Sequence, residues 1–206
     1  MAYFVQPPIA DPLSVTKEKS MTENQILDSE FSGMERKPLN LILLAVSLIV
    51  IGGIIGATTN LINGNVSEEY FRKIMGWEFG GIWKAAVLQG IFEGLIYGLI
   101  FSFIFTIGFA AITKMKADWK FAKKQLKKII ILIYSFWIIG GIIAIVLAFI
   151  YPVEYDQFIY GVPKETSLRI GYAWVGGSIW GGMIGGVISI IYGLIVTNRD
   201  WKKHIQ

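Results

Sequence analysis

Cysteine is absent from this chain of 206 residues, and histidine occurs only once. Without thiols the chain forms no disulfide, no thiolate metal site and no haem-attachment motif. The single histidine, His204, lies third from the C-terminus among basic residues, where we expect it to be solvated. The sequence therefore predicts that this chain alone holds no transition metal, no haem and no other cofactor.

Charge is also scarce, at 17% of the residues, and three long stretches contain none at all. These stretches cover residues 38 to 67, 129 to 153 and 170 to 198. Each is longer than the roughly 20 apolar residues that cross a bilayer. With 54% hydrophobic residues, the chain has more apolar surface than one soluble core can bury. The composition therefore predicts an integral membrane protein.

A fourth apolar window, residues 85 to 113, carries one charge, Glu93. Its fifteen Leu, Ile, Val and Phe residues favour insertion by about 4 to 9 kcal/mol, against about 2.5 to 3.5 kcal/mol for one central charge. The window is therefore expected to insert, and we predict an all-α membrane protein. Its four-helix transmembrane domain covers 38–198, with spans at 39–58, 83–112, 129–151 and 172–197.

The distribution of Lys and Arg predicts the orientation. Of nineteen cationic residues, the N-terminal tail at 1–37 holds four, the loop at 114–128 seven and the basic C-terminal tail at 199–206 three. All three segments fall on one side of four consecutive spans, and the positive-inside rule places that side in the cytoplasm. Both termini are therefore expected inside the cell (N-in/C-in), with the loops near 59–80 and 152–171 outside. The net charge of +4 reflects this topology, and we expect no nucleic-acid binding.

The expected location is the bacterial cytoplasmic (inner) membrane, because MAYFVQPPIADPLSV has neither the basic start nor the apolar run of a signal peptide. The lysines of 114–128 are suited to anionic lipid headgroups, at about 1 kcal/mol each near the surface, although topology alone also explains them. The 37-residue N-terminal tail contains QPPIADPL and has no apolar periodicity. It is expected to lack regular structure unless a partner orders it.

Two short motifs occur twice. IGGIIG at 51–56 reappears as IGGIIA at 139–144, 88 residues later, and GLIYGLI at 94–100 reappears as SIIYGLI at 189–195, 95 residues later. Because each unit holds two spans, both copies would have the same orientation in the membrane. We therefore predict two tandem parallel-repeat hairpins about a pseudo-two-fold axis along the membrane normal.

Glycines recur every four residues on the second and fourth predicted spans. In lipid, helices associate largely through close backbone approach at small residues. The spacing therefore predicts glycine-zipper packing, in which the grooves of these two spans interlock. The predicted helix-packing residues are Gly90, Gly94, Gly98, Gly177, Gly181 and Gly185.

Glu93 belongs to a polar stripe with Gln89 and Tyr97, since the three recur every four residues on one helical face. Three interpretations of this intramembrane carboxylate stay open. It is a buried hydrogen-bonding residue that fixes helix register, a solvated residue near the outer surface, or a working proton or ion site. The equivalent position in the second copy is Ile188, so a function of Glu93 would belong to one hairpin only.

The segment NVSEEYFRKIMGWEF, at 65–79, predicts a short amphipathic helix after the first span. Ser67 is a suitable N-cap, two glutamates occupy the first turn, and the apolar residues that follow have helical spacing. Trp77 and Phe79 are expected to anchor this helix at the membrane interface.

FEGLIYGLI, at residues 92–100, and the glycine-rich span before it resemble the helical hairpin of rotary ATPase proteolipids. In that family a carboxylate on the outer helix carries the ion, so the resemblance implies that Glu93 is an ion carrier with Gln89 as a helper. The chain departs from the family in its connecting loop, which is about twenty residues long and predicted outside. EEYFRKI followed by LQGIFEGLIYGLI is also similar to small glycine-rich bacterial membrane proteins of unknown function, which implies no activity.

Two classes of function follow. Glycine-faced helices and a tail that needs a partner favour a non-catalytic accessory or scaffold subunit of a larger membrane protein complex. The alternative is a small proton- or ion-conducting unit that uses Glu93. An enzyme is not expected, because the sequence offers no nucleophile with a neighbouring base, no metal cluster and no phosphate-binding loop.

Overall fold

A computed structural model describes the backbone of residues 12–204 and the side chains of residues 38–204. The chain divides into two units, Met1–Leu39 and Asn40–Gln206. The described residues are helical or lie in short connections, and they contain no strand. The helices are α1 (Pro12–Val66), α2 (Glu68–Met75), α3 (Ile82–Thr113), α4 (Trp119–Ile150), α5 (Pro152–Phe158) and α6 (Thr166–His204).

Four of these helices are long and apolar enough to cross a bilayer, which confirms the number of spans predicted from the sequence. The candidate spans are Pro38–Val66, Ile82–Thr113, Trp119–Ile150 and Thr166–His204. Several helix ends lie outside the predicted spans, because hydropathy marks where the chain meets hydrocarbon whereas caps decide where a helix starts. The clearest case is α4, where the Asp118 carboxylate accepts a 2.7 Å hydrogen bond from the Phe121 N–H.

The N-terminal tail differs from the prediction. Residues 12–37 belong to α1, although the sequence predicted no regular structure there, and residues 1–11 lie outside the described part of the chain. Extending an existing helix needs no new nucleus and adds one hydrogen bond per residue, so an adjoining membrane span favours helix in the tail. Pro38 lies inside α1, where its missing N–H removes one of these bonds.

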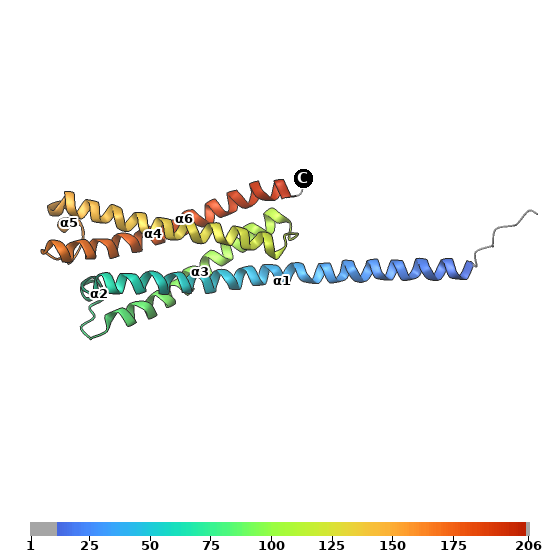
Figure 1. The fold of residues 1–206 in the computed structure, drawn as a ribbon, viewed down its shortest axis with the longest axis horizontal. Coiled ribbons are helices and arrows are strands. Elements are labelled where there is room, and N and C mark those ends of the chain that lie inside the picture. The colour runs from blue at the N-terminus through green and yellow to red at the C-terminus, as the bar shows by residue number, and fades with distance from the viewer. Residues whose placement is uncertain (1–11, 205–206) are drawn as a thin grey trace, which may run out of the picture. The chain divides into compact units, whose positions relative to one another are not determined.

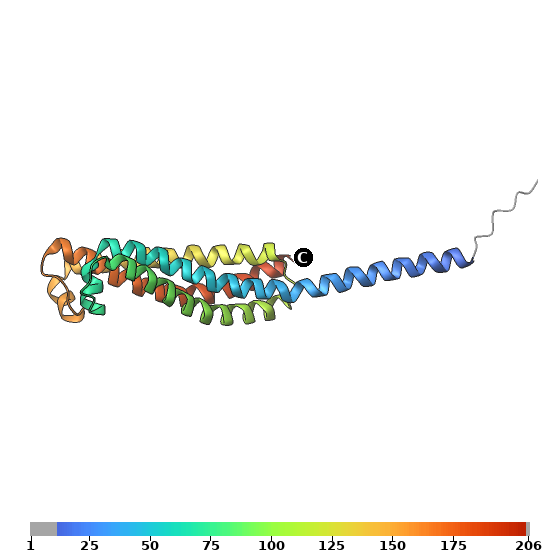
Figure 2. The ribbon, with the colours of Figure 1, turned by 90° about the horizontal axis from the view of Figure 1, so that it is seen from below.

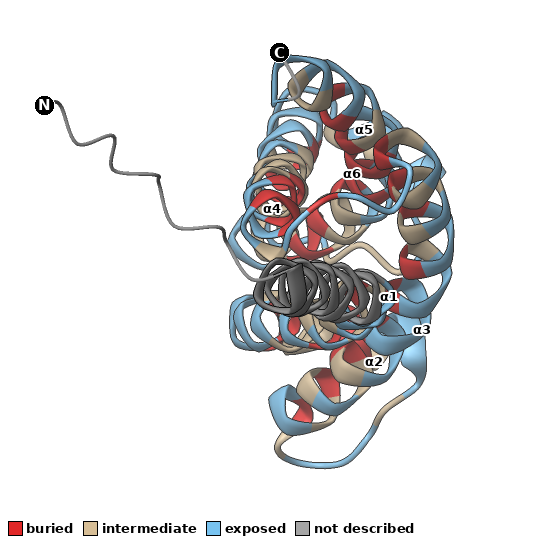
Figure 3. Ribbon diagram, turned by 90° about the vertical axis from the view of Figure 1, so that its right-hand side faces the viewer, coloured by how far each residue is buried: buried red, intermediate tan, exposed pale blue. Residues whose placement is uncertain are grey.

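In the second unit, α3, α4, α6 and the part of α1 from Asn40 onward form a four-helix bundle (Figure 1 and Figure 2). The short helices α2 and α5 lie at one end of the bundle, which we call the α2 end. The α3–α4 connection and the last turns of α6 lie at the other end, which we call the lysine end. Figure 3 shows the buried positions where helices face one another and the exposed positions on the outside. Many of those exposed positions carry large apolar side chains, as lipid contact requires.

Glycine contacts bring α1 against α3 in the first hairpin. A Cβ atom added at Gly94 would overlap the carbonyl oxygen of Gly52, and one added at Gly56 would overlap that of Gly90. Gly98 also lies close to backbone atoms of α1. Backbone therefore lies directly on backbone, which only small residues allow.

The second hairpin, formed by α4 and α6, has contacts of the same kind. A Cβ atom at Gly140 would overlap the Gly177 carbonyl oxygen, and one at Gly181 would overlap the Phe136 carbonyl oxygen. Gly185 lies against the Phe136 side chain. The predicted interlocking of the second and fourth spans is therefore wrong, because the predicted packing glycines of α3 lie against α1 and the predicted packing glycines of α6 lie against α4. The repeated IGGII motifs of α1 and α4 supply the small-residue surface that each groove needs.

These contacts also define a register between the hairpins. Gly52 meets Gly94 in the first hairpin, and Gly140 meets Gly177 in the second. The first helices are then offset by 88 residues (140 − 52), as the IGGII motifs are. The second helices are offset by 83 (177 − 94) and not by the 95 of the GLIYGLI match. The similar letters in that match do not mark equivalent contacts, and the tandem repeat remains a prediction.

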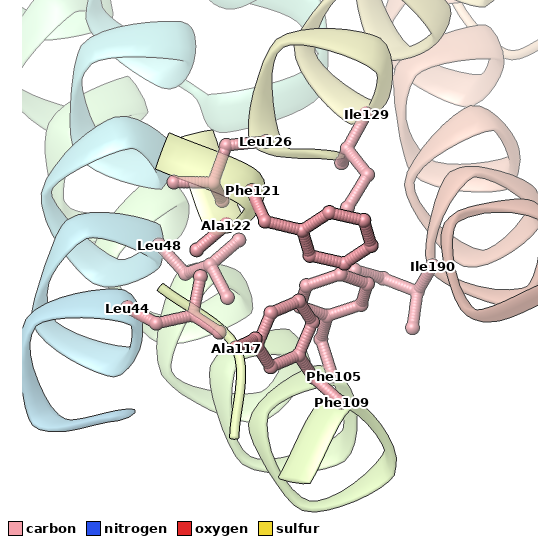
Figure 4. Close-up of a cluster of buried hydrophobic side chains, with 10 residues drawn as sticks. All are labelled: Leu44, Leu48, Phe105, Phe109, Ala117, Phe121, Ala122, Leu126, Ile129 and Ile190. Carbon is pink, nitrogen blue, oxygen red and sulfur yellow. The ribbon is translucent and has the colours of Figure 1, made fainter. Parts of the chain in front are cut away.

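All four long helices meet in an aromatic core near the lysine end (Figure 4). Phe105 and Phe109 of α3 have ring centroids 5.8 Å apart, and Phe121 of α4 lies 6.0 Å from Phe109. Leu44 of α1 and Ile190 of α6 belong to the same buried cluster. The two hairpins are therefore joined by large side chains at this end.

Gly94→Ala should destabilise the bundle, whereas Gly182→Ala should not. The new Cβ at position 94 would push the α1 and α3 backbones apart, and such overpacking costs about 1 to 3 kcal/mol. At Gly182 the new Cβ would lie 3.7 Å from the Trp137 Cδ1 atom, which is an ordinary contact. Thermal unfolding of the detergent-purified variants measures the difference, and equal melting temperatures would contradict the backbone contact.

Candidate functional site

A cavity of about 150 Å³ lies between the two hairpins. It extends along α1 from residue 48 to residue 63, which is about 22 Å at 1.5 Å per residue. All four long helices contribute to its wall, and most of the lining residues are Ile, Leu or Gly. The polar side chains on the wall include Thr59, Asn60, Asn63, Glu93, Tyr97 and Ser178.

The polar stripe predicted on α3 borders this cavity. Gln89 Nε2 donates a 2.8 Å hydrogen bond to Glu93 Oε1, so the structure brings these two residues together. Tyr97 lines the cavity one turn further on, and its ring stacks on Phe101 with the centroids 6.2 Å apart. Glu93 is exposed, and Tyr97 is 40% exposed. The carboxylate is therefore accessible to an occupant of the cavity.

Two asparagines, overlooked in the sequence, line the cavity at its α2 end. Asn60 Nδ2 donates a 3.0 Å hydrogen bond to the Ala86 carbonyl oxygen of α3. Asn63 Oδ1 accepts a 3.1 Å hydrogen bond from Ser178 Oγ of α6, which joins the two hairpins directly. The sequence held the signal, because the two asparagines are one helical turn apart in a charge-free span and polar side chains there usually bond across helices.

Two buried N–H groups beside the cavity, Asn63 Nδ2 and Trp137 Nε1, have no hydrogen-bond partner within the described part of the chain. Asn63 is 0% exposed and Trp137 is 7% exposed. The Trp137 ring packs edge to face on Trp174, with the centroids 5.2 Å apart. An unsatisfied buried donor costs about 1 to 3 kcal/mol, so each of these N–H groups lowers the stability of the folded bundle.

Helix α2 confirms the short helix and the N-cap predicted after the first span. The helix covers Glu68–Met75, and the Ser67 side chain accepts a 3.3 Å hydrogen bond from the Tyr70 N–H. Tyr70 and Phe71 are buried against α3 and α6. One face of α2 therefore packs on the bundle, and the other face is exposed. Burial, and then the charge of the Glu93 carboxylate, raise the pKa of the Tyr70 hydroxyl, which therefore keeps its proton at neutral pH.

At the lysine end an ion pair fastens α4 to α6. Lys128 Nζ lies 2.5 Å from Asp200 Oδ2, and Gln125 Nε2 donates to the same oxygen at 3.3 Å. The Asp200 side chain is only 13% exposed, so this pair is shielded from water more than a surface pair would be. The other six lysines of 114–128 are exposed. Their contact with anionic lipid headgroups remains a prediction.

Among residues 38–204 no group of three or more His, Cys, Asp or Glu side chains is placed to hold a metal ion. Comparisons with protein-family models, with curated proteins and with solved structures give no match. The chemistry of the cavity and of the lateral surfaces is therefore the basis for a functional proposal.

The hydrogen bond between Ser178 and Asn63 should couple the hairpins energetically. We expect Asn63→Ala and Ser178→Ala each to lower the unfolding free energy, and the double variant to lose less than the sum of the two losses. A coupling of about 0.5 to 1.5 kcal/mol is typical of one such bond. Reversible unfolding of the four proteins in detergent measures it, and strictly additive losses would show that this bond does not join the hairpins.

Proposed function

We propose that this chain is a non-catalytic accessory or scaffold subunit of a larger membrane protein complex. The observation that carries the proposal is a groove of about 370 Å³ on an exposed face of the second hairpin. The groove runs between α4 and α6 and is lined by apolar side chains and glycine backbone.

The groove has the composition of a helix-docking surface in a membrane. Gly140, Gly177 and Gly181 line it without contributing side chains. Trp180 and Ile184, which also line it, are 62% and 52% exposed. Small residues that let another backbone come close, next to large apolar side chains that pack around it, favour helix association in lipid. The glycines that join α4 to α6 therefore also offer a surface to a third helix.

Four apolar helices identify the chain as a multi-pass membrane protein. We place it in the bacterial cytoplasmic membrane with both termini inside, because its lysines and arginines are concentrated in the segments 1–37, 114–128 and 199–206. The separate N-terminal unit, Met1–Leu39, gives the complex a second point of contact on the cytoplasmic side. Its composition is too polar for it to bury a core alone.

Ile184→Trp should block the docking of a partner helix. The larger side chain fills the groove, and position 184 is exposed in this chain, so the bundle itself has room for it. Affinity purification of the tagged protein in a mild detergent, followed by mass spectrometry, should show the co-purifying membrane subunit reduced at least tenfold.

Ile195→Trp is the matched control for this experiment. Ile195 lies on the same helix, is 63% exposed and lines neither the groove nor the cavity. The control variant should keep the partner. Loss of the partner with both variants, or its retention with both, would show that the groove is not the docking surface.

Proton or ion conduction is a second candidate function, favoured by the position of Glu93. The carboxylate is exposed at the cavity wall and receives a hydrogen bond from Gln89. Acidic side chains within membrane spans commonly mark proton or ion paths. The resemblance of residues 92–100 to rotary ATPase proteolipids supports the same role.

Glu93→Gln should abolish conduction and leave assembly intact, because the amide keeps the shape of the side chain and removes its charge. Proteoliposomes loaded with a pH-sensitive dye and polarised with valinomycin measure the flux. Glu154→Gln, an exposed carboxylate of α5 away from the cavity, should conduct as the wild type does. Unchanged flux in intact Glu93→Gln protein would rule out conduction through this residue.

A further inference from the structure

Glu93 is the one charged side chain on the cavity wall among residues 38–204. Its hydrogen-bond partner is the neutral Gln89 amide. A carboxylate in an apolar setting gains more from a nearby positive charge than it would in water, because the local dielectric is low. The electrostatics of the cavity therefore favour a cation as its occupant.

The remainder of the wall favours an organic cation over a metal ion. Hard metal ions take six or more oxygen ligands, whereas residues 38–204 hold no cluster of metal-binding side chains. Tyr97, Phe101 and Trp137 bring three aromatic rings to the same wall. Aromatic faces attract ammonium groups, by about 0.5 to 2 kcal/mol. The Ile, Leu and Gly residues that make up most of the wall suit a hydrocarbon chain.

The shape of the cavity indicates how large the occupant is. The centre of a water-sized molecule can occupy about 150 Å³ here, spread over about 22 Å, so the space is long and narrow. A transmembrane helix, about 10 Å across, does not fit into it. A straight alkyl chain does, because it is long and thin.

Gly182 lines this space without contributing a side chain to it. Gly181 and Gly185 beside it lie against α4, where an added Cβ would overlap the Phe136 carbonyl oxygen or side chain. At Gly182 the nearest atom to an added Cβ is Trp137 Cδ1, at 3.7 Å. Helix packing therefore does not require glycine at position 182. A long side chain there would extend into the cavity, which Gly182 lines.

We propose that the cavity between the hairpins binds an amphiphilic organic cation, a protonated or quaternary amine on an alkyl chain, with its charge against Glu93. The alkyl chain lies along the apolar wall, and the ammonium group lies on the side of the wall that also carries Tyr97, one helical turn from Glu93. The exposed position of Glu93 gives a molecule dissolved in the bilayer access to the site. This binding goes beyond the accessory role and depends neither on a partner subunit nor on ion flow.

Dodecylamine and dodecanol are suitable probes, because they share a chain and differ in the charge of the head group at neutral pH. The full-length protein is reconstituted in lipid nanodiscs with either probe. Native mass spectrometry then counts the probe molecules that stay bound to the protein when it is released from the nanodisc. Wild-type protein should retain dodecylamine at least tenfold more than dodecanol. Glu93→Gln should lose that preference, and Glu154→Gln should keep it. Equal preference in the wild type and Glu93→Gln would overturn the proposal.

Gly182→Leu tests the cavity without changing its charge. This variant should lose at least nine-tenths of the bound dodecylamine, because the new side chain occupies the cavity. Ile191→Leu is the control on the same helix, at an exposed position outside the cavity, and should bind as the wild type does. Full retention by a folded Gly182→Leu protein, as judged by its melting temperature, would place the amine elsewhere and overturn the proposal.

Discussion

The contact of glycine backbone with glycine backbone is the interaction on which this bundle depends. Lipid tails are as apolar as leucine side chains, so burying leucine between helices gains little in a membrane. What remains is close packing, and it is closest where Gly52 meets Gly94 and where Gly140 meets Gly177. Each contact joins two helices that are neighbours in the membrane-crossing order. The result is two hairpins, each with a tight backbone interface of its own.

The cavity follows from the same glycines. Those of α1 and α3 also line the space between the hairpins, and they contribute no side chains to fill it. Toward the lysine end this space borders the buried cluster that contains Phe105 and Phe109, and at the α2 end the hydrogen bond from Ser178 to Asn63 crosses it. Between these two points the wall is apolar and glycine-rich, with Glu93 at its edge. Tight packing within each hairpin thus leaves a space between them.

The sequence was sufficient for the features that depend on composition and local spacing. Apolar runs predicted four membrane helices, and Ser67 with the two glutamates after it predicted α2. The pairing of helices could not be read in this way, because a glycine stripe shows that a helix packs closely without showing against which neighbour. The choice of α1 and α4 as partners depends on their IGGII motifs, whose small residues match the grooves only in three dimensions. The start of α4 at Trp119 depends on a cap at Asp118, which hydropathy does not detect.

The candidate site was predictable in part for the same reason. Gln89, Glu93 and Tyr97 share a helical face, and the bond between the first two needs only that spacing. The cavity brings together residues from four helices, such as Asn63, Trp137 and Ser178. No spacing of residues along the chain predicts such a cavity.

The way the glycine contacts are distributed along the chain also sets an order of assembly. Both partners of the first tight interface, α1 and α3, precede residue 114, so the ribosome has made them before α4 emerges. Segments completed early generally fold first during synthesis. The first hairpin can therefore pack before the second has been made, and the second can dock onto it afterwards. The cavity, which needs both, is the last part of the molecule to come into existence.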